Sequence, residues 1–564
     1  MADTDRETGG LSQAEIDQMV ASADTGGRSA GAFVAKLIAG IALAWSLFQL
    51  WFASPLPFAF GFGVFNDTEA RSIHLAFSLV LAFLAFPPED TPVQRILGIA
   101  APAILGGLLA LSAGDTFPAW IVLVIMAAVV VGCALPTRPD RVAIQEWIMA
   151  AAAGFCAAYL FLFYRELADR VGQPIDIDFI VSIAGLLLLL EATRRALGPA
   201  LVIVASFFLL YTVLGPYMPE IVAPKGNNLR EIINHHWITT EGVFGIALGV
   251  STSFVFLFVL FGALLDKAGA GNYFIQVAFS LMGHMKGGPA KAAVVSSAMT
   301  GLISGSSIAN VVTTGTFTIP LMKKVGFSAE KAGAVEVASS VNGQIMPPVM
   351  GAAAFLMVEY VGIPYFDVVT HAFLPAVISY IALVYIVHLE AAKAGMEGLP
   401  RPYTPGPLLR RLVGFVFGVV VLCAVSLAVY YGMGWIRPAF GEAAMIVVFL
   451  FLTAVYVALV AFGSNYPEPK MDDPNAPVIV TLGQENGLLV PLIAVHLFVF
   501  YFGIMADVTP PVGLASFAAA AVSGGDPIKT GFVAFFYSLR TAALPFLFIF
   551  NTDLLLIDVS VIEG

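Results

Sequence analysis

The sequence predicts an all-α, polytopic membrane protein. Of its 564 residues, 59% are hydrophobic and 12% are charged, whereas soluble proteins carry about 25% charged residues. Apolar stretches of about 20 residues, each long enough to cross a bilayer, recur along almost the whole chain. Two later stretches are broken by proline pairs, Pro347-Pro348 and Pro510-Pro511, with polar side chains just before them. We expect roughly 14 to 16 transmembrane or re-entrant helices.

The uninterrupted apolar stretches place the predicted spans in order. Before about residue 165 they contain few polar groups, as is typical of helices that face lipid or serve as a scaffold. From about residue 175 onward they contain Gly, Ser, Thr, Asn and Pro, and irregular backbone at membrane depth requires surrounding protein or a cavity. We therefore expect the binding site in the later region. The stretches are Phe33–Phe52, Ile73–Phe86, Ile96–Ser112, Ile121–Leu135, Trp147–Phe163, Phe179–Leu190, Leu201–Leu214, Ile246–Leu265, Val368–Leu389, Leu412–Tyr431 and Ala443–Phe462.

Composition and motifs disfavour several classes of function. The net charge of −11 argues against nucleic-acid binding, which needs a basic surface. The polar, acidic tail Met1–Gly31 lacks the basic region and cleavage site of a signal peptide, so the first apolar stretch is expected to be a retained helix. No HExxH motif, aspartate pair or Ser-His pair occurs at helical spacing, so the sequence does not indicate an enzyme or catalytic residues.

The stretch Lys291–Met322 contains too many hydroxyls and glycines for a lipid-facing helix. We expect a helical hairpin with a broken tip, because glycine permits a tight bend and the freed backbone groups then need partners. A half-helix N-terminus can bind an anion, and carbonyl, Ser, Thr or Asn oxygens can hold Na⁺. The alternative is ordinary packing of small residues between helices. The residues concerned are Gly301, Ser304, Gly305, Ser306, Ser307, Asn310, Thr313, Thr314 and Gly315.

A second irregularity is predicted at Asn342–Pro348. Proline lacks an amide hydrogen and clashes with the preceding turn, so the Pro347-Pro348 pair should end a helix, with Asn342 and Gln344 beside the break. Glu336 and Glu359 are each candidates for a proton-linked group, because ionisable residues within membranes are often functional; an interfacial position is the alternative for either. Lys323-Lys324 is expected in a basic turn, and no arginine stands out as a clamp for a carboxylate substrate.

These motifs resemble the large membrane subunit of the tripartite ATP-independent periplasmic (TRAP) transporters. The resemblance is strongest to the TAXI-type branch, in which the small and large membrane subunits are fused. It rests on ISGSSIANVVTTGTFTIPLMKKVGFSAEKAGAVE, NGQIMPPVMGAAAF and ADVTPPVGLASFAAAAVSGGDP. It covers most of the chain from about residue 180, and more loosely covers Phe33–Tyr164 as the small-subunit-like part.

The resemblance implies an elevator-type, inverted-repeat symporter of the bacterial inner membrane. Such a permease takes up an anionic organic acid with Na⁺, or with H⁺, from a periplasmic substrate-binding protein. That protein, the small organic anion and membrane lipid are the implied partners. The implied Na⁺ ligands are Ser304, Ser306, Asn310 and Thr509. The implied substrate- and ion-binding residues together are Ser304, Gly305, Ser306, Ser307, Asn310, Thr313, Thr314, Asn342, Gln344, Pro347, Pro348, Asp507, Thr509, Pro510 and Pro511.

The second repeat departs from the family pattern. A second glycine-rich hairpin should precede Pro510. The spacing between Ser304 and Pro347, however, leads back from Pro510 to Pro467, inside a polar, proline-rich loop. We therefore expect an incomplete second repeat, through an internal deletion, a sequence error or divergence. The alternative function is a transport-incompetent, scaffold or regulatory membrane protein of the same family.

The predicted organisation follows from these features. A polar tail (1–31) precedes small-subunit-like helices (32–172) and a first repeat (173–462) that holds the hairpin (291–322) and a broken helix (331–358). A polar loop (463–485) then leads to a remnant of the second repeat (486–564), with its own broken helix (505–522).

Overall fold

The computed structural model confirms an all-α fold of the membrane-spanning class. Every regular element in the described part of the chain is a helix, and seven of the described helices are long and apolar enough to cross a membrane. The expected span Ala443–Phe462 and the loop 463–485 lie outside the described residues, as do most of Leu412–Tyr431 and of the N-terminal tail. The structure describes residues 28, 31–88, 92–114, 116–137, 141–215, 218, 227–267, 270–399, 492–509, 513–550 and 552–557, with isolated positions 420, 424, 427 and 431.

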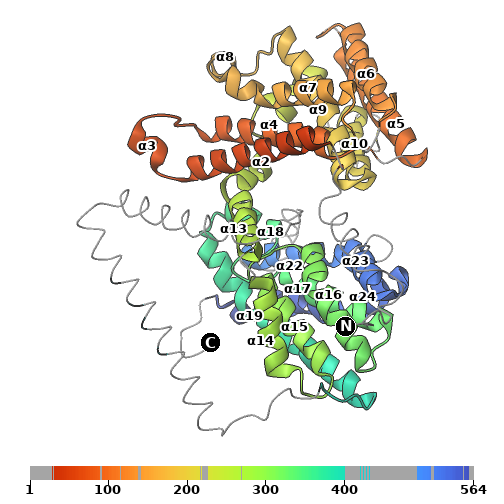
Figure 1. The fold of residues 1–564 in the computed structure, drawn as a ribbon. Coiled ribbons are helices and arrows are strands. Elements are labelled where there is room, and N and C mark those ends of the chain that lie inside the picture. The colour runs from red at the N-terminus through yellow and green to blue at the C-terminus, as the bar shows by residue number, and fades with distance from the viewer. Residues whose placement is uncertain are drawn as a thin grey trace. The chain divides into compact units, whose positions relative to one another are not determined.

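The chain divides into two compact units, an N-terminal unit that ends at Phe256 and a C-terminal unit that begins at Leu257. In Figure 1 the first runs from red to yellow-green and the second from green to blue. The boundary predicted at 172/173 rests on the resemblance to separate small and large membrane subunits, not on how the chain packs. It stays a prediction.

The N-terminal unit is built around α4, α7 and α9, which pack against one another. Its core contains the fully buried rings of Phe83, Tyr159 and Trp237, and burial of such large apolar side chains is a main source of packing energy. Its helices are α2 (Ala32–Ala53), α3 (Leu56–Phe60), α4 (Asp67–Ala85), α5 (Pro92–Ala113), α6 (Ala119–Ala134), α7 (Ile144–Leu162), α8 (Tyr164–Ala168), α9 (Asp176–Leu197), α10 (Pro199–Leu214), α11 (Leu229–Ile233), η3 (Asn234–Ile238), α12 (Ile246–Val250) and η4 (Ser251–Val255).

Buried charges in the N-terminal unit are paired. Glu146 lies 2.5 Å from the Arg28 guanidinium and 3.0 Å from that of Arg195, and all three side chains are fully buried. Glu191 binds Arg195 at 2.7 Å and Arg194 at 2.8 Å. Burying a charge costs much unless an opposite charge and hydrogen bonds accompany it, and this network supplies both.

The C-terminal unit places α15, α16 and α17 in mutual contact, and α17 also packs on α23 and α24 (Figure 1). The small residues of α17, among them Ala334, Ala338 and Ser339, are fully buried and allow this close approach. Its helices are α13 (Phe256–Lys267), α14 (Ala270–Met282), α15 (Gly288–Gly301), α16 (Ser307–Lys324), α17 (Ala329–Gly343), α18 (Ala352–Val361), α19 (Tyr365–Lys393), α22 (Leu492–Ile504), η5 (Met505–Asp507), α23 (Leu514–Ser523), α24 (Pro527–Phe550) and η6 (Thr552–Leu555).

The junction between α16 and α17 corrects one local expectation. Lys323 and Lys324 were predicted in a turn but form the last turn of α16, where positive charge is favoured by the helix dipole. The Lys323 ammonium donates to the carbonyl oxygen of Ser523 at 2.7 Å. The next helix begins at the N-cap Ser328, whose hydroxyl accepts from the Lys331 amide.

Candidate functional site at the hairpin tip and the helix breaks

The predicted hairpin consists of α15 and α16, joined at a tip by residues 302–306. Its tip lies against the first helix break through backbone rather than side chains. A Cβ atom at Gly305 would lie 1.7 Å from the carbonyl oxygen of Met350, and one at Gly301 would lie 2.7 Å from the Cα of Gly343. Only glycine fits at such distances, so the glycines of the tip set how closely the hairpin approaches the break.

The first predicted break falls between α17 and α18. Helix α17 ends at Gly343, and α18 begins at Ala352 after an irregular segment that contains a cis peptide bond between Pro347 and Pro348. The segment is closed by the Gly351 amide, which donates to the carbonyl oxygen of Gln344 at 2.6 Å. Pro347 is buried, and Pro348 is exposed.

Asp507 joins three distant segments of the chain. Its Oδ2 atom accepts a hydrogen bond from the Ser307 hydroxyl at 2.5 Å and another from the Gln344 side-chain amide at 2.6 Å. Ser307 begins α16, Gln344 caps α17, and Asp507 ends η5. The hairpin tip, the first break and the approach to the second break therefore meet at one carboxylate oxygen.

Positive potential at Asp507 comes from a helix end. No Lys, Arg or His lies within ion-pair distance of it in the part of the chain that the structure describes. The N-terminus of α16, at Ser307, carries the positive end of the helix dipole. A carboxylate with hydroxyl and amide neighbours is a suitable set of oxygen ligands for a small hard cation.

The second break is described in part. Helix α22 passes into η5, and α23 begins at Leu514, so regular α-helix is interrupted where the sequence predicts it. Thr509 is exposed, and its hydroxyl donates to the Met505 carbonyl oxygen at 2.6 Å. Pro510 and Pro511 lie outside the described residues.

The other predicted residues of α16 lie at different depths. The Ser306 hydroxyl caps α16 by accepting from the Ala309 amide, and the half-buried Ser304 hydroxyl accepts from the Ser306 amide. One turn further on, the buried Asn310 donates to the Ser297 carbonyl oxygen at 2.9 Å. Thr313 is half-buried, whereas Thr314 is fully buried and belongs to a separate cluster.

That cluster surrounds Glu336 of α17, which is fully buried. Its Oε1 atom accepts from Ser297 at 2.8 Å, from Ser340 at 3.4 Å and, more closely, from Thr314. Its Oε2 atom accepts from Thr318 at 2.5 Å. The cluster therefore ties both arms of the hairpin to α17. By contrast, Glu359, the other candidate glutamate, is exposed on α18.

Asn342 and Gln344 separate into different surroundings. Gln344 bonds Asp507, whereas Asn342 donates to the Ser379 hydroxyl at 2.8 Å and accepts from Thr541 at 3.0 Å. Residues two apart on a helix do not face the same side, which accounts for the division. Asn342 thus connects α17 to α19 and α24.

Arg540 was missed by the sequence argument. Its Nε donates to the Ser379 carbonyl oxygen at 3.0 Å, its Nη1 donates to that of Tyr537, and its Nη2 is buried without a hydrogen-bond partner among the described residues. The available signal was an arginine in the middle of the apolar helix α24.

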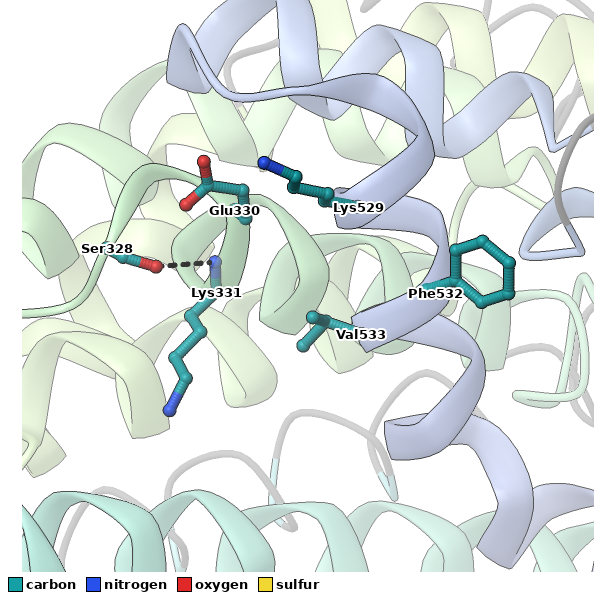
Figure 2. Close-up of a pocket in the computed structure, with 6 residues that line it drawn as sticks. All are labelled: Ser328, Glu330, Lys331, Lys529, Phe532 and Val533. Carbon is teal, nitrogen blue, oxygen red and sulfur yellow. Dashed lines mark hydrogen bonds between the residues drawn. The ribbon is translucent and has the colours of Figure 1, made fainter.

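A surface hollow of about 440 Å³ lies apart from these clusters. Figure 2 shows its lining, with Ser328, Glu330 and Lys331 on one side and Lys529, Phe532 and Val533 on the other. It adjoins the start of α17, whereas Gln344 lies at the opposite end of that helix. None of its lining residues belongs to the predicted site.

Comparisons with known proteins agree with the motifs. Residues 184–467 and 474–562 match the family model described as "Tripartite ATP-independent periplasmic transporter, DctM component". The uncharacterized protein YgiK of Salmonella typhimurium is 22% identical over 50% of this chain and 69% of its own length. The C4-dicarboxylate TRAP transporter large permease protein DctM of Rhodobacter capsulatus is 34% identical over 16% of this chain.

The matched stretches span only a small part of the length of several relatives. The uncharacterized protein y4mL of Sinorhizobium fredii is 28% identical over 25% of this chain, and the match spans 34% of that relative. The match to the Rhodobacter permease spans 21% of its length.

Proposed function

Because this chain belongs to the family of the DctM component of tripartite ATP-independent periplasmic transporters, we propose that it is a permease for a small organic anion. Uptake is driven by an ion gradient, with Na⁺ as the main coupling ion, and the anion is delivered by a periplasmic substrate-binding protein. The observation that carries the proposal is the Asp507 carboxylate, which is bonded both by the hairpin tip and by the first helix break.

The Na⁺ site is proposed at the tip, with Asp507 and the hydroxyl oxygens of Ser304, Ser306 and Ser307 as ligands. A cation there would neutralise Asp507, which otherwise lacks a positive partner among the described residues. Thr314 is not included, because its hydroxyl is bonded to Glu336. The anion would then bind beside the cation and the N-terminus of α16, since both attract negative charge.

Reconstituted uptake tests this proposal. The full chain is purified, placed in proteoliposomes and supplied with its substrate-binding protein and a panel of radiolabelled C4-dicarboxylates under an inward Na⁺ gradient. We expect accumulation by the wild type and a loss of about 100-fold or more in Asp507→Ala, because the cation then lacks its charged ligand. The matched control is Asp553→Asn, which alters an exposed carboxylate in the same unit and should leave uptake unchanged.

One observation favours a second candidate function, a scaffold or regulatory protein that does not itself transport. The sequence predicts an incomplete second repeat, and the family match is interrupted between residues 467 and 474, within the predicted loop 463–485. No uptake under any ion gradient, together with co-purification of an intact permease, would favour this alternative. Resequencing the gene across Pro474–Val478 would show whether the junction is genuine.

A further inference from the structure

The cluster around Glu336 differs from an ordinary buried ion pair. The carboxyl group is fully buried, and its partners in the described part of the chain are four hydroxyls, those of Ser297, Thr314, Thr318 and Ser340. An isolated ionised carboxylate is costly in a low-dielectric interior, so the group must gain either a proton or a cation. A metal ion would have to enter between oxygens that already touch, whereas a proton needs no added space.

The chemistry of the partners suits a group that changes its protonation state. A hydroxyl can donate or accept a hydrogen bond, whereas an ammonium, guanidinium or amide N–H only donates. When Glu336 is ionised, Ser297, Thr318 and Ser340 can donate to it, and Thr314 can donate either to it or to the Asn310 carbonyl oxygen. When it is protonated, one hydroxyl rotates to accept its O–H while the others keep donating. The carboxyl group therefore keeps hydrogen-bond partners in both states.

Other titratable groups lie near the Glu336 cluster. Tyr380 on α19 is in electrostatic contact with both Glu336 and Arg540, and its hydroxyl donates to the Ser339 carbonyl oxygen. Helix α23 carries no titratable side chain. Several other titratable groups lie on the helices packed against α17. Lys291 and His388 bond each other, and Glu390 bonds Lys331 and Tyr537. The rest are Lys323 and Lys324 at the end of α16, Glu330 and Lys529 beside the surface hollow, and Asp367, His371 and Lys393 on α19.

The cluster is connected to the hairpin tip. The Thr314 hydroxyl, which contacts Glu336, also contacts the Asn310 carbonyl oxygen at 2.7 Å. The Asn310 amide in turn donates to the carbonyl oxygen of Ser306 at 3.1 Å. Ser306 precedes Ser307, which bonds Asp507. A change at Glu336 can therefore reach the proposed Na⁺ site through one face of α16.

We infer that Glu336 is a proton-binding site coupled to transport, separate from the Na⁺ site at Asp507. One proton binds the carboxylate when the unit faces the more acidic side and leaves as H⁺ when it faces the other, with no further reactant. The inference rests on the proposed function for its role in uptake, but proton binding by Glu336 does not depend on it.

Infrared difference spectroscopy tests proton binding without transport. The full chain is labelled with ¹³C-glutamate, reconstituted in lipid and titrated between about pH 5 and pH 9. We expect a protonated-carboxyl C=O band that grows at low pH, disappears in Glu336→Gln and persists in Glu359→Gln. Glu336→Asp should keep a protonated-carboxyl band at a changed position. This variant replaces Glu336→Gln as the test if Glu336→Gln does not fold. An unchanged band in Glu336→Gln, or a band that responds to Na⁺ but not to pH, would overturn the inference.

Proteoliposome uptake tests the coupling. In the wild type an acid-outside pH gradient should raise the uptake of the same C4-dicarboxylate panel by about 5-fold or more at fixed Na⁺. In Glu336→Gln the ratio of uptake with and without the pH gradient should fall to about one, whatever the basal rate, because the site can no longer gain a proton. A ratio that stays at the wild-type value would overturn the coupling. Absence of wild-type uptake under every gradient would instead contradict the proposed function, and the infrared titration would still decide whether Glu336 binds a proton.

Discussion

The two units of this protein treat buried charge in opposite ways. In the N-terminal unit, Glu146 and Glu191 are held by the guanidinium groups of Arg28, Arg194 and Arg195. In the C-terminal unit, the fully buried Glu336 and the half-buried Asp507 are held by hydroxyls and one amide. A charge that already has its counterion is suited to a fixed framework. A carboxylate without one can bind a proton or a cation, which is what the proposed ion-driven uptake requires.

The largest expected effect comes from breaking the paired region. Glu146→Gln should lower the apparent free energy of unfolding in detergent by about 3–5 kcal/mol, because two buried guanidinium groups lose their shared counterion. Chemical unfolding followed by tryptophan fluorescence measures the change. Glu166→Gln, an exposed carboxylate on α8 of the same unit, is the control and should lie near the wild type. Equal stability of the two variants would show that the network is not needed for the fold.

A smaller loss of stability is expected at the hairpin tip. Gly305→Ala should cost about 1–3 kcal/mol, because the added methyl group collides with the Met350 carbonyl oxygen and the tip must move away. The same unfolding assay applies, with uptake as a second readout. Gly503→Ala is the matched control, since that helical glycine has open space around it. If the two variants behaved alike, the close backbone contact would not exist in the folded protein.

The smallest effect on stability is expected where the charge has no counterion. Glu336→Gln should change the free energy of unfolding by about 1 kcal/mol or less, because the amide replaces the carboxyl group among neutral hydroxyls and leaves no buried cation unpaired. Comparison with Glu146→Gln under identical conditions isolates the difference between the two units. A loss of unfolding free energy as large as that of Glu146→Gln would contradict the difference between the two units.

The helix ends around the candidate site could be predicted, because glycine and proline act locally. The hairpin expected in 291–322 is observed as α15 and α16, and the break expected after Asn342 follows Gly343. The contacts made by side chains depend on partners far along the chain, so Asn342 and Gln344 were grouped although they bond different helices. Helical geometry could have separated them. Glu336 and Glu359 could not be ranked, because burial depends on packing that a single sequence does not show.

The contact of Gly305 with Met350 limits which substitutions this protein can accept during evolution. A contact between side chains can be retuned by many substitutions, but this one is made by main-chain atoms, and a Cβ at Gly305 has no room. Position 305 should therefore reject all nineteen alternatives in a saturation mutagenesis screen for function, while neighbouring positions such as Ile308 accept several. New substrate preferences must then arise from other residues, because position 305 has no alternative residue to offer.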